Sequence, residues 1–438
     1  SYISSSSSKT GNGGYIVIDT DDLLVEGLSQ IETATMYRAS SSEEAVFIGG
    51  QGGNLTISAE NINMKMGAME LGTWGSGESG IADISAKELN LNNGSIIFGD
   101  AYGWGDDWQY ATGKGPNINL EVESIYLDGE SSIDMKSTGA GNAGNLMITS
   151  LSLVVDNDSR ISSKSSMTGN AGSITINTDT VKLIQGGAIE TFTEFRATSD
   201  EELNLKGGRG GDLLVDANEI ILQRGRMEIG TWGSGDSGYA NFVAEKLTLG
   251  QGSVISGDAY GLGYLTEDRA GVELIGPDTW MYATGNGPEL FLDVDRVHIN
   301  ESSSINMKST GAGNAGSLKI ESAMLAIDDH SIISSKASMT GDAGNIVIDT
   351  EKLSLTGDGK IETYTEFRPV ITEETNITAG SGGDLVVNAR EIVLDHGKME
   401  LGTWGNGAGG SATIKADTLT LRNSSMDADA MGESYLKK

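Results

Sequence analysis

The feature that most constrains this chain is a long internal repeat. The heptapeptide at residues 69–75, MELGTWG, returns almost unchanged at 227–233 and again at 399–405. A second segment, MKSTGAGNAG at 135–144, recurs letter for letter at 307–316. A chain that repeats itself on this scale is typical of a solenoid, which can lengthen without dividing its core into separate domains. We therefore predict one solenoid over residues 1–438. Its parts are a partial repeat (1–68), two full repeats (69–226 and 227–398) and a partial third repeat (399–438).

A shorter unit lies within each large repeat. It begins after a glycine-rich turn, and apolar residues follow at fixed positions, as Ile174, Ile176, Val181, Leu183 and Ile189 do after one such turn. The spacing of two within each pair is the period of a β-strand. Each unit is therefore predicted to be a rung of three short strands, and the chain an all-β, right-handed parallel β-helix of about thirteen rungs, five to each large repeat. The turns that start the rungs end at Gly14, Gly53, Gly80, Pro116, Gly144, Gly172, Gly211, Gly238, Pro288, Gly316, Gly344, Gly383 and Gly410.

Composition excludes several classes of function. The formal net charge of −33 disfavours nucleic acid and anionic membrane surfaces as partners. No cysteine is present, so disulfides and thiolate metal sites are excluded. No apolar run approaches the length that spans a membrane, and direct membrane insertion is not expected. Because Ser1 lies within a repeat, we expect the chain to be a mature or truncated piece of a longer protein.

The rung G-N-A-G-x-[LI]-x-I-x-[ST]-x-x-[LV]-x-[LI] resembles the repeats of filamentous-haemagglutinin-type exoproteins, most clearly at 141–161, 169–189 and 313–333. The resemblance implies secretion across a bacterial outer membrane by the two-partner route. It also implies a surface-attached β-helical rod that acts in adhesion, cell–cell contact or matrix building. The expected location is therefore extracellular, on a bacterial cell surface.

Parallel β-helices can also carry polysaccharide-processing enzymes, so recurring acids were considered as catalysts. One rung position holds Glu32, Glu190 and Glu362, a second holds Glu70, Glu228 and Glu400, and a third holds Asp100 and Asp258. Glu190 and Glu228 belong to adjacent rungs and could form a carboxylate pair for glycoside hydrolysis. A site copied in every repeat is, however, more simply an exposed ladder of acids. The three histidines, His298, His330 and His396, fall at unrelated rung positions. We therefore expect no enzyme.

The aromatic residues are concentrated after the third predicted strand of each rung, where the longest insertions also leave. Loops on a rigid scaffold commonly bind partners, and tryptophan and tyrosine faces stack on sugars or proteins. The alternative is that these side chains fold back and cover the third strand. The binding hypothesis predicts an aromatic edge made of Trp74, Trp104, Trp108, Tyr110, Phe195, Trp232, Tyr260, Trp280, Tyr282 and Trp404.

No organic cofactor is expected, but one inserted segment could bind calcium. Asp100, Asp106 and Asp107 lie close together in the sequence GDAYGWGDD and offer the oxygen ligands that calcium prefers. Simple solvation of an acidic loop is the alternative.

Three functions follow from these patterns. The first is a surface fibre that binds cell-surface or matrix glycans or proteins, or neighbouring copies of itself, through the aromatic edge. The second is a polysaccharide lyase or glycosidase. The third is a structural filament with no ligand, in which the loops bind neighbouring rods.

Overall fold

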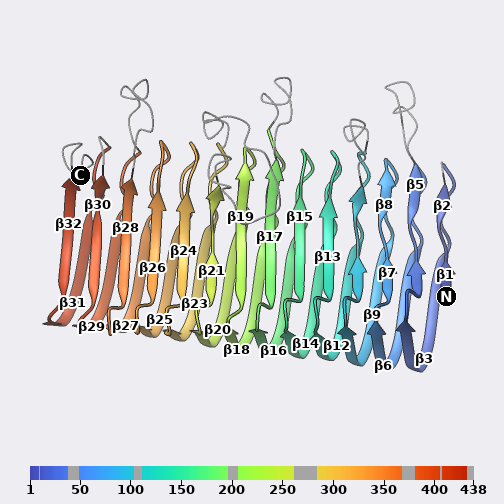
Figure 1. Cartoon of the computed structure of the whole chain (residues 1–438), viewed down its shortest axis with the longest axis horizontal. Coiled ribbons are helices and arrows are strands. Elements are labelled where there is room, and N and C mark those ends of the chain that lie inside the picture. Colours follow the sequence, from blue (N-terminus) through green and yellow to red (C-terminus); the bar gives the residue numbers. More distant parts are fainter. Residues whose placement is uncertain are drawn as a thin grey trace. The chain divides into compact units, whose positions relative to one another are not determined.

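The computed structural model describes residues 1–8, 10–37, 49–102, 111–195, 206–260, 284–366, 380–404 and 407–431. The contacts divide the chain into two compact units. Unit 1 comprises Ser1–Glu219 and Gly225–Met227, and unit 2 comprises Ile220–Arg224 and Glu228–Lys438. The division falls close to the predicted repeat boundary at residues 226 and 227. Every described element is a β-strand (Figure 1), so none of them is a helix that could cross a membrane. One continuous solenoid over residues 1–438 stays a prediction.

Each predicted rung contributes one long strand of 11 or 12 residues. Along the chain, the long strands alternate with the short strands described below. The boundary between the two units falls within β18, after Glu219. The long strands are β3 (Tyr15–Glu26), β6 (Asn54–Lys65), β9 (Ile81–Asn92), β12 (Asn117–Leu127), β14 (Asn145–Val155), β16 (Ile174–Ile184), β18 (Leu213–Gln223), β20 (Tyr239–Gly250), β23 (Glu289–Ile299), β25 (Ser317–Ile327), β27 (Ile346–Thr356), β29 (Leu385–Asp395) and β31 (Ala412–Arg422).

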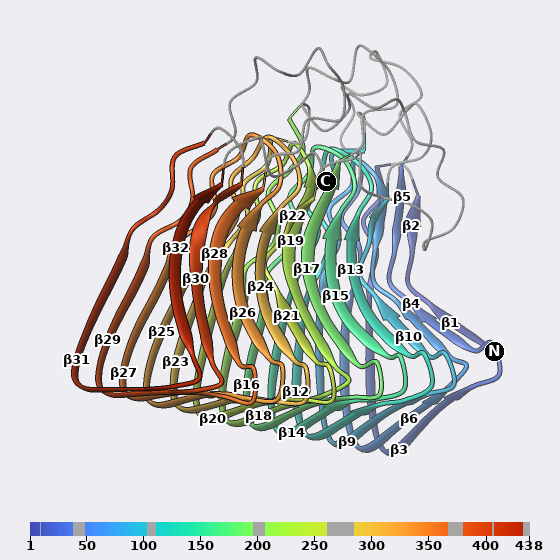
Figure 2. The ribbon, with the colours of Figure 1, turned by 60° about the vertical axis from the view of Figure 1, so that its left-hand side comes forward.

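Short strands form a second wall in each unit, opposite the long strands (Figure 2). Where a rung carries two of them, they are consecutive pieces of the predicted third strand. The short strands are β1 (Tyr2–Ser4), β2 (Ser7–Ser8), β4 (Gln30–Glu32), β5 (Thr35–Tyr37), β7 (Ala68–Glu70), β8 (Thr73–Gly75), β10 (Ile96–Phe98), β11 (Ala101–Tyr102), β13 (Ser132–Ser137), β15 (Arg160–Ser165), β17 (Ala188–Phe195), β19 (Arg226–Gly233), β21 (Val254–Ser256), β22 (Ala259–Tyr260), β24 (Ser304–Ser309), β26 (Ile332–Ala337), β28 (Lys360–Glu366), β30 (Lys398–Trp404) and β32 (Ser425–Met431).

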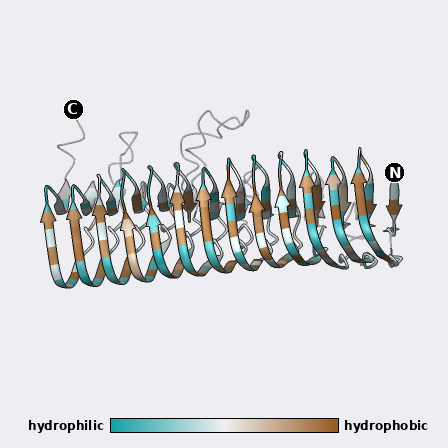
Figure 3. Cartoon of the chain, turned by 90° about the horizontal axis from the view of Figure 1, so that it is seen from below, coloured by the Kyte–Doolittle hydropathy of each residue, from teal (hydrophilic) through white to brown (hydrophobic). Residues whose placement is uncertain are grey.

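Neighbouring rungs pair in parallel and in register, which places like residues above one another. In unit 1, Ile118 is the Cα partner of Leu146, which in turn pairs with Ile174. All three side chains are at most 1% exposed. In unit 2, Leu290 pairs with Leu318 in the same way. Apolar and polar residues alternate along the long strands (Figure 3), as a strand with one buried face requires. The predicted columns and the parallel β-helix fold are confirmed.

The structure corrects one detail of the predicted rung. The first two strands are one continuous strand with a bend, and no turn separates them. Between β12 and β14 the paired residues run from Asn117 to Glu121 and resume at Ser124. The second apolar pair of a rung begins an odd number of positions after the first ends, as Leu153 of β14 lies five positions after Ile148. In a straight strand they would point to opposite faces, and the bend turns both inward.

Glycine is required where the turns of neighbouring rungs touch. A Cβ atom on Gly172 would lie 1.5 Å from the carbonyl oxygen of Gly144, and one on Gly144 would lie 1.7 Å from that of Pro116. Such contacts cannot be relieved without separating the rungs. The recurring glycine of each turn therefore sets how closely the rungs stack.

We predict that Ile176→Asp destabilises its rung and that Asn177→Asp does not. Ile176 is fully buried beside Ile148, whereas Asn177 is exposed on the same strand. Burying an unpaired carboxylate should cost several kcal/mol, on the order of 3 to 5 kcal/mol. Rungs couple chiefly to their neighbours. Hydrogen exchange should therefore show loss of protection centred on β14 and β16. Uniform loss of protection throughout unit 1 would contradict nearest-neighbour coupling.

Candidate functional site

Two aromatic pairs lie at equivalent places in the two units, where the short strands end. In unit 1, Trp74 of β8 stacks on Tyr102 of β11, with ring centroids 4.6 Å apart and planes at 14°. In unit 2, Trp232 of β19 meets Tyr260 of β22 edge-on, at 5.0 Å and 62°. All four side chains are half-buried. Each pair therefore leaves part of its surface exposed and uses the rest for packing, and a binding role for it stays a prediction.

Carboxylates hold these aromatic rings by their polar atoms. Trp74 Nε1 donates a hydrogen bond of 3.2 Å to Glu70 Oε1, and Gln30 Nε2 donates one of 2.6 Å to Glu70 Oε2. In unit 2, the Tyr260 hydroxyl donates to Asp258 Oδ2 over 2.6 Å. Acidic oxygens therefore accompany the aromatic rings in both units.

The prediction that Phe195 belongs to an exposed strip is wrong. Phe195 ends β17 and is only 3% exposed, so it packs into the core. The backbone of Trp404 ends β30, but its side chain lies outside what the structure describes. The same holds for five other predicted members of the aromatic edge, and a continuous aromatic strip stays a prediction. These five are Trp104, Trp108, Tyr110, Trp280 and Tyr282.

The prediction that the recurring acids form an exposed ladder is also wrong for two of the three positions. Glu32, Glu190 and Glu362 are 7%, 3% and 6% exposed, and Asp100 and Asp258 are buried as well. They sit on, or directly after, the short strands, where side chains of the neighbouring rungs cover them. A repeat pattern shows that an acid recurs at one position of the rung, but it does not show how far its side chain is exposed to solvent.

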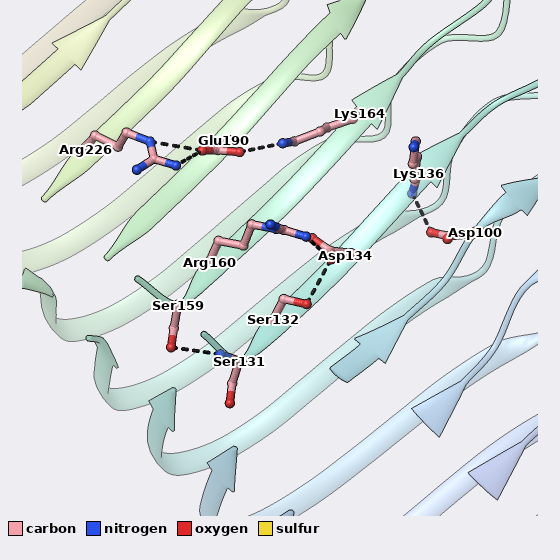
Figure 4. Close-up of polar contacts among 10 residues, drawn as sticks. All are labelled: Asp100, Ser131, Ser132, Asp134, Lys136, Ser159, Arg160, Lys164, Glu190 and Arg226. Carbon is pink, nitrogen blue, oxygen red and sulfur yellow. Dashed lines mark hydrogen bonds and ion pairs between the residues drawn. The ribbon is translucent and has the colours of Figure 1, made fainter. Parts of the chain in front are cut away.

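Glu190 has cations on both sides (Figure 4). Lys164 Nζ lies 2.7 Å from Glu190 Oε2, and Arg226 Nη2 lies 2.5 Å from Oε1. Burial favours the neutral acid, but the two cations outweigh it and hold the pKa of Glu190 below its usual range. An ionised, doubly paired carboxylate cannot serve as the proton donor of a glycosidase. Glu190 therefore acts here as a structural anion.

Two further acids of this wall have different surroundings. Asp134 accepts a forked pair of hydrogen bonds from Arg160, at 3.1 Å and 3.0 Å, and a third from Ser132. Burial raises the pKa of Glu32 above its usual value, with a smaller contribution from the charge of Glu70. The same wall thus contains Glu190, whose pKa the neighbouring cations lower, and Glu32, whose pKa burial raises.

Asp100 and Asp258 occupy one rung position in the two units and have nearly the same surroundings. Asp100 Oδ1 accepts the backbone N–H of Lys136 at 3.0 Å, and Asp258 Oδ1 accepts that of Lys308 at 2.9 Å. Burial, helped by the charge of Asp134, raises the pKa of Asp100 to about 7. Burial alone raises the pKa of Asp258 to about 6. Each carboxyl is buried at the end of a short strand and titrates near neutral pH.

The predicted calcium site cannot be assembled from the described residues. Asp100 is described, but Asp106 and Asp107 lie outside the described ranges. Within those ranges, no three histidines or acids are arranged to hold a metal ion. Calcium binding therefore stays a prediction.

Each histidine lies beside an aspartate, which the sequence analysis missed. His298 Nε2 is 3.0 Å from Asp328 Oδ2. His396 Nδ1 is 2.9 Å from Asp395 Oδ1, a neighbour in the sequence. His330 Nδ1 lies 3.5 Å from a carboxylate oxygen of the next rung, on Asp358. The register between rungs was needed to find the first and third pairs, because their members are far apart in the sequence.

Neither the family models nor the curated proteins nor the solved structures that were compared with this chain give a match. The resemblance to filamentous-haemagglutinin-type repeats therefore rests on the rung pattern alone.

We predict that Asp100→Asn makes unit 1 more stable at pH 7 and changes little at pH 4. The folded protein holds this proton up to about pH 7, whereas the unfolded chain releases it near pH 4. The wild-type carboxyl therefore lowers stability progressively as the pH rises from 4 to 7. The gain of the variant should reach on the order of 2 to 4 kcal/mol at pH 7. Asp293→Asn, on an exposed site, is the control. Parallel stability curves for Asp100→Asn and wild type would contradict this account.

We predict that Glu190→Gln destabilises unit 1 by about 2 kcal/mol, because Lys164 and Arg226 lose the charge between them while staying partly shielded. Chemical denaturation at pH 7 measures the effect. Glu60→Gln is the matched control, since its ion pair with Lys87 is more than half exposed and should contribute little. Equal losses in the two variants would show that burial of the pair does not matter.

Proposed function

We propose that this chain is part of an extracellular structural and adhesive fibre on a bacterial cell surface. Its partners are cell-surface or matrix glycans or proteins, or neighbouring copies of the same fibre. The observation that carries the proposal is the repetition of an aromatic pair, Trp74 with Tyr102 and Trp232 with Tyr260, at the same rung position in both units. The net charge of −33 suits a soluble surface that repels nucleic acid.

Repetition at fixed intervals suits a partner that is itself a polymer. One half-buried aromatic pair offers a small contact area and would bind weakly. Several such contacts on one scaffold gain affinity together when the partner spans them. Aromatic faces stack on sugar rings and on protein side chains, and the neighbouring carboxylates orient polar groups. The inserted segments that follow the short strands would enlarge this contact surface.

A polysaccharide-processing enzyme is not favoured by the described geometry. The acid that best matched a catalytic role, Glu190, is an ionised partner of Lys164 and Arg226. A catalytic carboxylate of this kind would need a proton to donate or an open face toward a substrate. Loss of glycan depolymerisation in Glu190→Gln or Glu228→Gln would nevertheless overturn the fibre proposal.

The proposal predicts that Trp104→Ala, Trp108→Ala and Trp280→Ala together weaken adhesion or bundling and leave folding unchanged. None of the three lies in the apolar columns of the rungs. Circular dichroism reports the fold, and cell-binding and sedimentation assays report contact. We expect a loss of about tenfold or more in apparent affinity, since contacts with a repeated partner are lost together.

Leu151→Ala provides the matched control, because Leu151 is 56% exposed on the long strand β14, in the opposite wall. It should bind like the wild type. Unchanged binding by a correctly folded triple tryptophan variant would remove the aromatic edge from the proposal. Loss of the β-sheet signal would assign these residues to packing instead.

A further inference from the structure

A polar groove of about 460 Å³ lies in unit 1, along the turns that lead into the long strands. It crosses five successive rungs, those with turns ending at Gly80, Pro116, Gly144, Gly172 and Gly211. With rungs about 4.8 Å apart, five of them span about 20 Å. We call this the turn groove. It is long, narrow and parallel to the direction of stacking, so it fits an extended ligand.

The floor of the turn groove carries almost no side chains. Its glycines cannot be replaced by larger residues, because they touch the preceding rung. A Cβ atom on Gly211 would lie 1.9 Å from the carbonyl oxygen of Gly172. Ala143 and Ala171 add only methyl groups. A ligand can therefore approach the backbone closely over several rungs.

One wall is an asparagine ladder with a fixed orientation. Asn142 Oδ1 accepts the backbone N–H of Asn170 at 3.0 Å, and Asn170 Oδ1 accepts that of Arg209 at 2.8 Å. Because each side-chain oxygen faces the next rung, each Nδ2 group is turned the other way. Both asparagines are exposed. Two amide donors thus stand one rung apart along this wall.

The opposite wall repeats the arrangement with Asn117, Asn145 and Ser173. Asn145 Nδ2 donates to Asn117 Oδ1 at 3.1 Å, and the backbone N–H of Ser173 donates to Asn145 Oδ1 at 2.9 Å. This ladder leaves the Asn117 amide and the Ser173 hydroxyl as polar groups at the groove. The first wall therefore offers amide donors one rung apart, and the second offers polar groups two rungs apart.

The charges that line the groove come in neutralising pairs. Lys114 Nζ lies 3.5 Å from Glu78 Oε1 near one end, and Arg209 Nη2 lies 2.9 Å from Asp212 Oδ1 near the other. The groove is polar without a dominant charge, in a protein whose net charge is −33. This favours a neutral ligand over a polyanion.

We propose that the turn groove binds an extended, uncharged glycan chain lying across the rungs. The amide donors of Asn142 and Asn170 would bind its hydroxyl or ring oxygens, and the flat glycine floor would admit the width of a sugar ring. An extended peptide would chiefly seek an open strand edge, whereas these rungs are already paired on both sides. The inference concerns different residues from those of the aromatic edge and does not depend on the proposed function.

The test measures binding of linear neutral hexasaccharides, built from glucose, N-acetylglucosamine, mannose or galactose, to the whole chain on an array and then by calorimetry. The variant is Asn142→Asp with Asn170→Asp, which keeps the acceptor oxygens and removes the amide donors. The chain itself shows that aspartate supports such a ladder, because Asp342 Oδ1 accepts the backbone N–H of Ser381 at 2.6 Å. Asn63→Asp, on the exposed face of β6, is the control for the added charge.

We expect at least one hexasaccharide to bind, with an affinity that rises from disaccharide to hexasaccharide. The double variant should weaken it about tenfold or more, with an unchanged thermal unfolding temperature, and Asn63→Asp should bind like the wild type. Binding of no hexasaccharide, equal binding by the double variant, or no dependence on chain length would each overturn the proposal. Tighter binding of an extended neutral peptide of equal length would assign the groove to a peptide instead. None of these outcomes bears on the tryptophan variants.

Discussion

The structure depends on in-register parallel pairing between successive rungs. The strands of each rung bond through their backbone to the rungs above and below, so neighbouring rungs must place equivalent residues at equivalent positions. Apolar residues then form columns such as Ile118, Leu146 and Ile174. The same constraint brings the turns so close that a Cβ atom on Gly172 would collide with the rung beneath it. Sequence repetition in this chain is the consequence of that geometry.

The wall of short strands contains several buried acids, and the fold stabilises them in two different ways. A carboxylate between two rungs can be held ionised by cations of both neighbours, as Glu190 is by Lys164 and Arg226. Where burial dominates, as at Asp100, the pKa rises to about 7. The cost of burying such a charge is large, and paired cations offset it without necessarily adding stability. This chemistry serves the scaffold, whereas the proposed binding surfaces are the turn groove and the aromatic edge.

Much of the fold could be predicted from the sequence, because the apolar columns follow directly from the period of two. The number of long strands and their parallel pairing agree with the rung pattern. The bend in each long strand was missed, although the odd separation of Ile148 and Leu153 contained the signal. Phe195 was misassigned for a similar reason. It shares the alternation of Ile189, and β17 extends far enough to keep it facing inward.

The candidate sites were less predictable, because they depend on which rungs meet. The sequence located Trp74, Trp232 and Tyr260, but it did not show that each tryptophan pairs with a tyrosine of the next rung. The register between rungs was also needed to show that Glu32 and Asp100 are buried. It was needed as well to find the aspartates beside His298 and His330. The turn groove was not predicted, because it forms only where the turns of five rungs stack on one another. The side-chain oxygens of its asparagines serve the turns, but their amide groups are left to face the groove.

The most direct test of the central claim is electron cryotomography of cells that produce the protein, with the chain labelled by a specific antibody. A surface fibre predicts label outside the outer membrane, on slender projections that reach neighbouring cells or matrix. Isolated projections would favour adhesion, and ordered bundles would favour lateral assembly, both within the proposal. Label confined to the cell interior, or spread outside the cell without any fibre, would contradict it.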